Sequence, residues 1–277
     1  MKKFKKALAL LLTASMLFVL SACGSSSSST SSTKSKIDEI KEAGVLVVGT
    51  SADYPPYEFH TEIDGVDTIV GFDISFSQYF ADALGVELEV VDMSFDNLLI
   101  GLSEGQFDLV MAGLTPTEER KESVDFTDII FSNPQIVIVR TEDKDIYTTT
   151  DSLSGHYVGV QKGTIQEDIA ADLTDQDDII SLVTFSDLII ELKEGKIDAI
   201  CTNYLTAAAY VAANDDLTIN DIGIEYEDTG FAGAVQKGNE DFVEYLNGLI
   251  QEMKDKGLID QYIVEAEELA GIESVDG

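Results

Sequence analysis

Short apolar runs alternate with amphipathic stretches along the first part of the chain. Three runs have the length and composition of buried strands: residues 45–49, 86–91 and 107–111. Three stretches carry apolar residues at helical spacing: residues 37–43, 71–84 and 95–103. Gly85 is placed to stop the second of these helices. Alternating strands and helices predict a mostly parallel sheet flanked by helices, as in an α/β fold.

The segment between the first strand and the first long helix is predicted to be a loop. Residues 50–59 contain Pro55 and Pro56, which we expect to hold the backbone extended. The same segment carries the aromatic residues Tyr54, Tyr57 and Phe59.

The strand and helix pattern restarts after residue 134. Strands are predicted at residues 135–140 and 157–160, with a helix beginning at Thr164. Two further runs look like strands that return toward the first lobe: residues 217–226 and 231–235. Two closing helices are predicted: residues 239–256, ended by Gly257, and residues 260–269.

A weak internal repeat relates the two parts of the chain. Residues 95–111 match residues 185–201 at an offset of 90, with Phe, Leu, Glu, Gly and Asp at corresponding positions. The repeat predicts two related α/β lobes. We expect lobe 1 to comprise residues 37–131 and 232–277, lobe 2 to comprise residues 132–231, and a two-segment hinge to join them near 131–134 and 228–233.

The first residues have the features of an export signal. A lysine-rich start is followed by an apolar stretch at residues 7–20, which is short for a membrane span. The sequence Leu20-Ser21-Ala22-Cys23 resembles a bacterial lipobox. We therefore expect a signal peptide over residues 1–22, lipidation of Cys23, and a flexible Ser/Thr-rich tether over residues 23–36.

Composition excludes several function classes. The chain has 17 Lys plus Arg and 52 Asp plus Glu; without the four lysines of the signal peptide, 13 basic residues face 52 acidic ones. So few basic residues make nucleic acid an implausible partner. Cys201 is the only cysteine besides Cys23, so no internal disulfide is expected, and an inert core cysteine is the favoured interpretation.

No catalytic or metal-binding motif stands out. The two histidines, His60 and His156, have no metal-ligand spacing, and no phosphate loop, G-x-S-x-G motif or Cys–His pair is evident. We therefore expect no metal, no cofactor and no enzymatic activity.

Residues 107–120 combine a strand with a helix start that suits an anion. Thr115 can cap the helix, Pro116 suits its first position, and Glu118 completes a T-x-x-E capping box. The free N–H groups and positive dipole end of such a helix favour an anion, and Arg120 lies close by. The alternative is a surface helix whose arginine pairs with neighbouring glutamates. A second T-x-x-E sequence begins at Thr164, directly after a glycine.

Four motifs resemble those of a known family. They are Tyr54-x-Pro56-Tyr57-Glu58, Gly71-Phe72-Asp73-Ile74, residues 108–120 (DLVMAGLTPTEER), and Val158-Gly159-Val160-x-x-Gly163-Thr164. From about residue 44 to 269 the chain resembles the substrate-binding proteins of polar amino-acid ABC transporters. This resemblance implies the two-lobed type II periplasmic-binding-protein fold.

The resemblance also implies the residues that hold the ligand carboxylate. Arg120 would bind it in a bidentate pair, for which arginine is better suited than lysine. Thr115 would add its hydroxyl or N–H, and Gly113 a backbone group. Thr164 and Ile165 would bind the same carboxylate from the second lobe.

The rest of the ligand would meet aromatic walls and one unusual polar residue. Tyr54 and Phe95 would flank the side chain, although either could be ordinary core. Asn203 stands where the family usually has an aspartate that pairs with the ligand α-ammonium. An amide accepts that bond without charge, which leaves two possibilities open. Glu58 or Asp53 supplies the charge, or the ligand is not a standard α-amino acid.

The resulting hypothesis is a monomeric solute-binding lipoprotein on the outer face of the cell membrane of a Gram-positive bacterium. It would capture a polar amino acid, or a related small carboxylate, by hinge closure and deliver it to an ABC permease and its ATPase. Its only membrane contact would be the lipid anchor. Two alternatives are a cleft enzyme of the same fold, such as a prephenate- or arogenate-type dehydratase, and a ligand-sensing surface lipoprotein. The sequence does not identify the ligand side chain.

Overall fold

The computed structural model describes residues 34–226 and 230–272. The chain from Lys34 onward forms one compact unit. The predicted signal peptide, Cys23 and all of the tether before Lys34 lie outside the described residues. The first described helix, α1 (Lys36–Ala43), begins one residue before its predicted start and is capped by the side chain of Ser35. No helix in the described ranges is long and apolar enough to cross a membrane.

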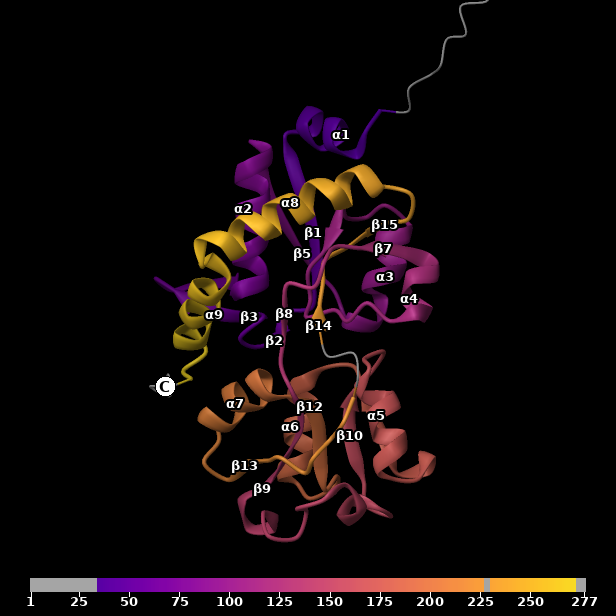
Figure 1. Cartoon of the computed structure of the whole chain (residues 1–277). Helices are drawn as coiled ribbons and strands as arrows, with labels where there is room; N and C mark the ends of the chain where they lie inside the picture. Colours follow the sequence, from indigo (N-terminus) through magenta and orange to yellow (C-terminus); the bar gives the residue numbers. More distant parts are fainter. Residues whose placement is uncertain (1–33, 227–229, 273–277) are drawn as a thin grey trace, which may run out of the picture. The chain divides into compact units, whose positions relative to one another are not determined.

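The first lobe is built on a five-stranded sheet (Figure 1). Its strand order is β5 (Glu87–Asp92), β1 (Val45–Thr50), β6 (Leu109–Val110), β15 (Ala234–Gln236) and β7 (Val124–Phe126). The three runs predicted as strands all contribute to this sheet, as β1, β5 and β6. β1 is parallel to both of its neighbours, whereas β15 is antiparallel to β6 and β7. The sheet is therefore mixed: β15, which comes from a later part of the chain, runs antiparallel to both of its neighbours.

Helices cover both faces of this sheet. They are α2 (Phe72–Leu84), α3 (Phe95–Ser103), α4 (Glu118–Ser123), α8 (Glu240–Lys256) and α9 (Leu258–Leu269), together with α1. Phe72, Phe76 and Phe80 form a buried stripe on α2, at the spacing that gives a helix one apolar face. The bounds predicted for α3 and the stop of α2 at Gly85 are confirmed.

The second lobe has a five-stranded sheet of its own. Its strand order is β11 (Ile179–Leu182), β10 (Val158–Gln161), β12 (Ala199–Asn203), β9 (Gln135–Arg140) and β13 (Leu217–Asn220). The helices around it are α5 (Gln166–Leu173), α6 (Phe185–Lys193), α7 (Tyr204–Ala212) and the short η1 (Thr141–Asp143), η2 (Thr150–Leu153) and η3 (Gln176–Asp178). The run at 217–226, predicted to return toward the first lobe, instead places β13 in this second sheet, paired with β9.

The internal repeat occupies equivalent places in the two sheets. In lobe 1, α3 leads into β6, the third strand, which is flanked by parallel β1 and antiparallel β15. In lobe 2, α6 leads into β12, again the third strand, flanked by parallel β10 and antiparallel β9. The prediction of two related α/β lobes is therefore confirmed at the level of topology.

Two chain segments connect the lobes. They meet as a short antiparallel ribbon, in which β8 (Phe131–Ser132) pairs with β14 (Gly230–Phe231). The predicted lobe boundaries, 131/132 and 231/232, fall on this ribbon. A hinge at this ribbon stays a prediction.

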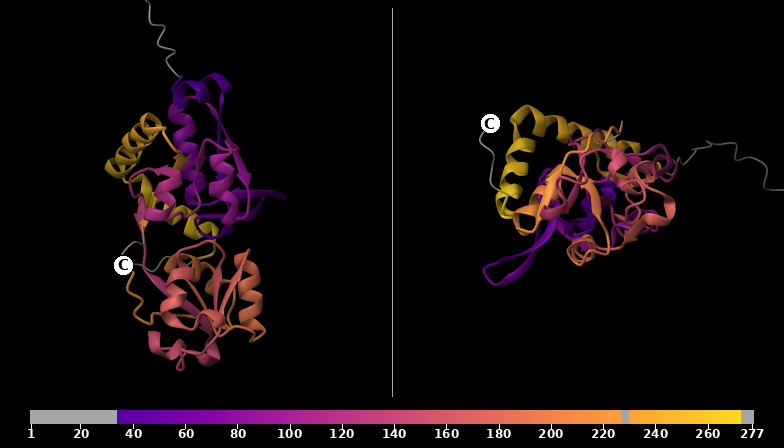
Figure 2. Two further views of the ribbon diagram at one scale, coloured as in Figure 1. Left: turned by 90° about the vertical axis from the view of Figure 1, so that its right-hand side faces the viewer. Right: turned by 90° about the horizontal axis from the view of Figure 1, so that it is seen from below.

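Residues 50–59 do not form the extended loop that the prolines predicted. Pro55 and Pro56 lie in a turn closed by a hydrogen bond from Tyr57 N to Tyr54 O at 3.0 Å. This turn joins β2 (Asp53–Tyr54) to β3 (Glu58–Ile63), which pairs in turn with β4 (Val66–Val70). The prediction was wrong because the fixed backbone angle of proline suits a turn as well as an extended chain. The β3–β4 hairpin projects from the lobe as the indigo arm in the right-hand view of Figure 2.

The turn and the start of α2 are packed backbone against backbone at Gly71. Its φ is +129°, and a Cβ there would lie 2.1 Å from the carbonyl oxygen of Tyr57. Gly65, in the β3–β4 hairpin, has a φ of +80° and open space around it. A side chain at Gly65 would therefore meet only the cost of a left-handed backbone, whereas a side chain at Gly71 would also overlap the backbone of Tyr57.

We predict that Gly71→Ala destabilises the fold far more than Gly65→Ala. Gly65→Ala should reduce the free energy of unfolding by about 1–2 kcal/mol, the cost of a left-handed backbone for a non-glycine residue. Gly71→Ala should lose at least about 3 kcal/mol, because backbone must also move. Urea denaturation of the chain from Lys34 measures both values. Equal losses would show that the turn does not pack against α2 as described.

Candidate functional site

One cavity is lined by residues from both lobes. Its lining comprises Ser51, Tyr54, Glu58, Phe95, Ala112, Gly113, Thr115, Arg120, Gln161, Thr164, Ile165, Gln166 and Phe231. Seven of the eight ligand-binding residues predicted from the sequence are in this set; only Asn203 is absent. Whether these residues bind a ligand stays a prediction.

The helix that carries Arg120 begins two residues later than predicted. α4 begins at Glu118, and the side chain of Thr117 caps it by accepting a hydrogen bond from Arg120 N at 3.2 Å. The predicted capping by Thr115, with Pro116 as the first helical residue, is wrong. Both threonines have the right chemistry, and Thr117 has the extended backbone of a cap, with φ −67° and ψ 157°. Thr115 does not cap the helix; it is buried and lines the cavity.

The guanidinium of Arg120 spans the two lobes. Nη1 donates to the carbonyl oxygen of Thr115 at 2.6 Å, and Nη2 donates to that of Gly163 at 2.9 Å. The group also lies over the Phe95 ring, 5.5 Å from its centroid. Burial lowers the pKa of Arg120 to about 10, so the side chain is charged at neutral pH.

Arg120 keeps capacity for a further partner. A guanidinium has five N–H donors, and these two bonds use two of them. Within residues 34–226 and 230–272, Arg120 forms no ion pair with a carboxylate. The alternative in which this arginine pairs with neighbouring glutamates is therefore not what the structure shows.

The second predicted helix start also differs from a capping box. α5 begins at Gln166, and its N-cap residue, Ile165, makes no side-chain capping bond. The hydroxyl of Thr164 donates instead to Gln161 O at 2.7 Å, and Glu167 accepts from Gly163 N at 3.0 Å. The first turn of α5 thus reaches the cavity with its N-terminus uncapped by a side chain. Such a helix end attracts an anion.

Asn203 lies behind the cavity wall rather than in it. It is the last residue of β12 and the N-cap of α7, where its Oδ1 accepts from Thr206 N at 3.1 Å. Its Nδ2 donates to the Tyr54 hydroxyl at 2.7 Å, and Thr202 bonds the same hydroxyl at 2.9 Å. Asparagine is a preferred N-cap, so local helix chemistry engages the amide before any ligand does. Through these bonds the second lobe fixes the position of Tyr54.

Glu58 places an unpaired carboxylate at the cavity. The residue is 0% exposed, and no N–H or hydroxyl group of the described residues bonds either carboxyl oxygen, but the side chain of Asp73 lies close enough for the two acids to share a proton. Burial raises the pKa of Glu58 well above its usual value, and the neighbouring Asp73 raises it further. Burying a carboxyl group without a partner is costly, so a cation in the cavity would stabilise its charged form.

Asp73 lies next to the cavity and fixes the backbone of one lining residue, Gly113. It is 3% exposed, and its Oδ2 accepts from Gly113 N at 2.8 Å, which holds Gly113 at the cavity with a φ of +53°. Burial raises the pKa of Asp73 to about 7, although the Gly113 bond opposes the shift. The Gly113 N–H, one of the backbone groups available for the predicted carboxylate role, is therefore already engaged by Asp73.

Six lining residues were not among the predicted ligand-binding set: Ser51, Glu58, Ala112, Gln161, Gln166 and Phe231. Glu58 had a signal, since it belongs to a quoted motif and was considered as a source of negative charge. Gln161 ends β10 at the edge where the helix starts gather, which strand and helix order could have indicated. Phe231 reaches the cavity from the returning segment, and only tertiary structure reveals this.

No group of three or more His, Cys, Asp or Glu residues in the described part of the chain is arranged to hold a metal ion. The buried Cys201 has no disulfide partner there, and burial raises the pKa of its thiol to about 12. A thiol with so high a pKa is a poor nucleophile.

Comparison with known proteins gives consistent results. The model of the bacterial extracellular solute-binding proteins, family 3, matches residues 46–265. The arginine-binding extracellular protein ArtP of Bacillus subtilis is 37% identical over 262 residues, covering 93% of this chain and 96% of the relative. The L-cystine-binding protein TcyJ of Escherichia coli is 31% identical, covering 80% and 82%.

Solved structures with this fold include arginine complexes. An amino acid ABC transporter substrate-binding protein, AbpA, from Streptococcus pneumoniae, bound to L-arginine, has a TM-score of 0.81 at 36% identity and covers 85% of this chain and 99% of its own. The arginine-bound form of truncated ArgBP from T. maritima has a TM-score of 0.71 at 39% identity, covering 78% and 99%. These neighbours share the two-lobed periplasmic-binding-protein fold predicted for this chain.

The raised pKa of Asp73 predicts how stability depends on pH. The folded protein holds this proton more tightly than the unfolded chain does, because an unperturbed aspartate has a pKa of 3.8. The stabilisation is complete below about pH 4 and is lost as the pH rises through about 7. Asp73→Asn removes the titration, while its amide oxygen can still accept from Gly113 N.

We expect wild type to lose about 2–4 kcal/mol more unfolding free energy than Asp73→Asn between pH 4.5 and 7.5, since each pKa unit is worth about 1.4 kcal/mol. Denaturant unfolding of both proteins across this range measures the difference. Parallel pH profiles would show that Asp73 does not carry this titration.

Proposed function

Because the chain belongs to the bacterial extracellular solute-binding proteins of family 3, we propose that it captures arginine in the cavity between its lobes. Members of this family and the relatives described above are exported amino-acid-binding proteins of ABC transporters, not enzymes. The protein is thus an amino-acid-binding component of such a transporter. We propose arginine as the ligand, the roles of the cavity residues in binding it, closure of the two lobes around it, and a lipid anchor on Cys23.

Glu58 is the observation that supports a cationic ligand. Glu58 is a buried carboxyl group that meets another acid, Asp73, and no cation of the described chain, which favours a ligand that brings positive charge and several N–H donors. A guanidinium meets both requirements, because its planar donors match a carboxylate in two parallel bonds. The aromatic rings of Tyr54 and Phe95 would flank its flat faces.

Arg120 supports a carboxylate at the other end of the ligand. It is charged, lines the same cavity and is not paired with any carboxylate of the described chain. The uncapped start of α5 at Ile165 adds a second feature that favours an anion. We propose that Arg120, Thr115 and the N–H groups around Thr164 and Ile165 hold the ligand carboxylate, with Gly113 shaping the wall beside them.

The named ligands of several relatives agree with this reading. The Bacillus relative is an arginine-binding protein, and the Streptococcus and T. maritima structures contain arginine. The cystine-binding relative shows that the family also serves other amino acids. The choice of arginine for this chain therefore depends on Glu58, with the relatives as support. Asn203 would act on the ligand indirectly, by holding Tyr54.

We further propose how binding is coupled to transport. Ligand contacts from both lobes would favour the closed state, with bending at the β8–β14 ribbon. The closed, loaded monomer would dock on an ABC permease powered by its ATPase. A lipid on Cys23 and the Ser/Thr-rich tether would hold the protein at the outer face of the cell membrane of a Gram-positive bacterium.

We predict that three related ligands separate the possible roles of Glu58. Citrulline keeps the α-ammonium of arginine but has a neutral side chain, and 4-guanidinobutanoate keeps the guanidinium but lacks the ammonium. If Glu58 pairs with the guanidinium, arginine should bind at least about 30-fold more tightly than citrulline, because a charged hydrogen bond is lost. Calorimetric titration of the chain from Lys34 gives the affinities. Citrulline binding as tight as arginine, with weak binding of 4-guanidinobutanoate, would place the ammonium on Glu58 instead.

Glu58→Gln tests the charge itself at constant shape. We expect arginine affinity to fall by about 2–4 kcal/mol, because one member of a buried ion pair is lost, and citrulline affinity to change little. Glu62→Gln is the matched control, since Glu62 lies exposed on the same strand. Unchanged arginine affinity in Glu58→Gln would contradict the proposed recognition of a cation.

A further inference from the structure

Asp53 belongs to the first lobe, where it bonds Ser51, but it also forms several hydrogen bonds to the second lobe. Its Oδ2 accepts from Phe185 N at 2.7 Å, and both carboxylate oxygens lie within 3.2 Å of Gln161 Nε2. Its carbonyl oxygen accepts from the Tyr210 hydroxyl at 2.9 Å. One residue of β2 thus contacts three elements of lobe 2, namely β10, α6 and α7.

The carboxylate occupies the N-terminus of α6. Phe185 is the first residue of that helix, so its N–H has no partner within the helix. Thr184 caps the same turn by accepting from Asp187 N at 3.3 Å, and Asp53 satisfies the next free donor. A negative charge at this end of a helix is also favoured by the helix dipole. The start of a lobe 2 helix is therefore completed by a residue of lobe 1.

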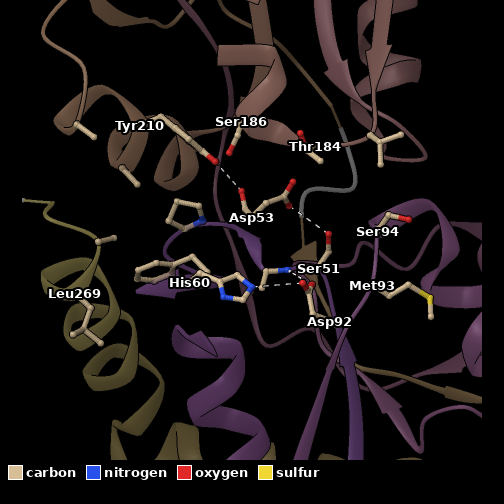
Figure 3. Close-up of a pocket in the computed structure, with 17 residues that line it drawn as sticks. Ser51, Asp53, His60, Asp92, Met93, Ser94, Thr184, Ser186, Tyr210 and Leu269 are labelled. Carbon is tan, nitrogen blue, oxygen red and sulfur yellow. Dashed lines mark hydrogen bonds and ion pairs between the residues drawn. The ribbon is translucent and has the colours of Figure 1, made fainter. Parts of the chain in front are cut away.

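These bonds lie between the ligand cavity and a separate open groove. Gln161 and Ser51 line the cavity, whereas Asp53 lines the groove together with Ser51, Thr184 and Tyr210. Figure 3 shows Asp53 at the centre of that groove, between Tyr210 of lobe 2 and Ser51 of lobe 1. Separation of the lobes at this point would open a path from the cavity to solvent.

The bonds of Asn203 and Thr202 to the Tyr54 hydroxyl also cross the lobes, but they belong to a residue assigned to the ligand. Two further polar contacts across the lobes differ in character. The ion pair of Lys162 with Asp96 spans 2.8 Å, but the lysine side chain is 53% exposed, and exposed pairs contribute little. The bond from Arg120 to Gly163 belongs to a residue assigned to the ligand. Asp53 is more protected, and burial is the main cause that raises its pKa, against the bonds from Phe185, Gln161 and Ser51. Its bonds would be exchanged for water whenever the lobes part.

We propose that Asp53 is a positioning residue that latches the two lobes over the bound amino acid and slows its release. The inference rests on the proposed function for the identity of the ligand, but the latch itself concerns only the two lobes. Asp53 does not line the ligand cavity, and of the residues that do it bonds Gln161 and Ser51, so its removal should leave the contacts assigned to Glu58 and Arg120 in place. Loss of the latch should therefore accelerate release and leave capture by the open form almost unchanged.

The test compares Asp53→Asn and Asp53→Ala with wild type in the chain from Lys34. Asp67→Asn is the matched control, because Asp67 is exposed on β4 and its side chain bonds only His60 in the part of the chain that the structure describes. Stopped-flow measurement with arginine should show release at least tenfold faster for both Asp53 variants, with the association rate within about twofold of wild type. Asp67→Asn should match wild type in both rates.

A second measurement follows the lobes without any ligand. Spin labels on cysteines introduced at Ile100 and Ile190, exposed and equivalent positions of α3 and α6, report the distance between the lobes. Each Asp53 variant should shift this distribution toward the open form. Wild-type release rates together with a wild-type distance distribution would overturn the latch. If wild type does not bind arginine, the proposed ligand fails, and the distance measurement alone decides the latch.

Discussion

The proposed ligand site depends on one carboxyl group, that of Glu58, which is buried without a cationic partner in the described chain. Glu58 sits in the interior beside Asp73, where burial and this second acid raise its pKa well above the usual value, and the described chain supplies no cation that would stabilise its charged form. Arg120 carries the opposite charge on the same cavity, yet the two are not paired. A ligand with a cation at one end and a carboxylate at the other would satisfy both groups at once. The site is thus described better by two separated charges than by any single motif.

The fold keeps these charges apart and brings both lobes to them. β2 contributes adjacent residues with different tasks: Tyr54 bonds Asn203 and Thr202 behind the cavity, while Asp53 completes the start of α6. Tyr54 and Phe185 also pack edge to face, with ring centroids 5.6 Å apart. A two-residue strand therefore connects the lobes by both polar and apolar contacts. Its position is fixed by the turn at Pro55 and Pro56, which packs on Gly71.

Much of the architecture could be predicted from the sequence, because strand and helix periods are local properties. The stop of α2 at Gly85 and the equivalent places of α3 and α6 follow from such patterns. Antiparallel β15 could not be predicted in this way, because it joins the sheet from more than a hundred residues further along the chain. The turn at residues 55–57 was mistaken because proline suits two backbone shapes equally well.

The sequence predicted which residues line the cavity better than it predicted the hydrogen bonds that those residues make. Arg120 and Thr164 could be placed at helix starts, but neither predicted capping box forms, since Thr117 and the Gln161 carbonyl offer closer partners. Asn203 could be found as a departure from a family pattern. The cap that its Oδ1 forms with Thr206 N is local to the start of α7, but the bond from its Nδ2 to Tyr54 depends on β2, which is distant in sequence. Such competition among hydrogen-bond partners is decided only in three dimensions.

The most direct test of the account is a crystal structure of the chain from Lys34 with arginine. We expect the guanidinium to lie within about 2.7–3.0 Å of the Glu58 carboxylate, and the ligand carboxylate to lie on Arg120 and the start of α5. A reversed ligand, with its α-ammonium on Glu58, would contradict the assignment of the buried charge to the side chain. Arginine bound without any contact to Glu58 would contradict the central claim altogether.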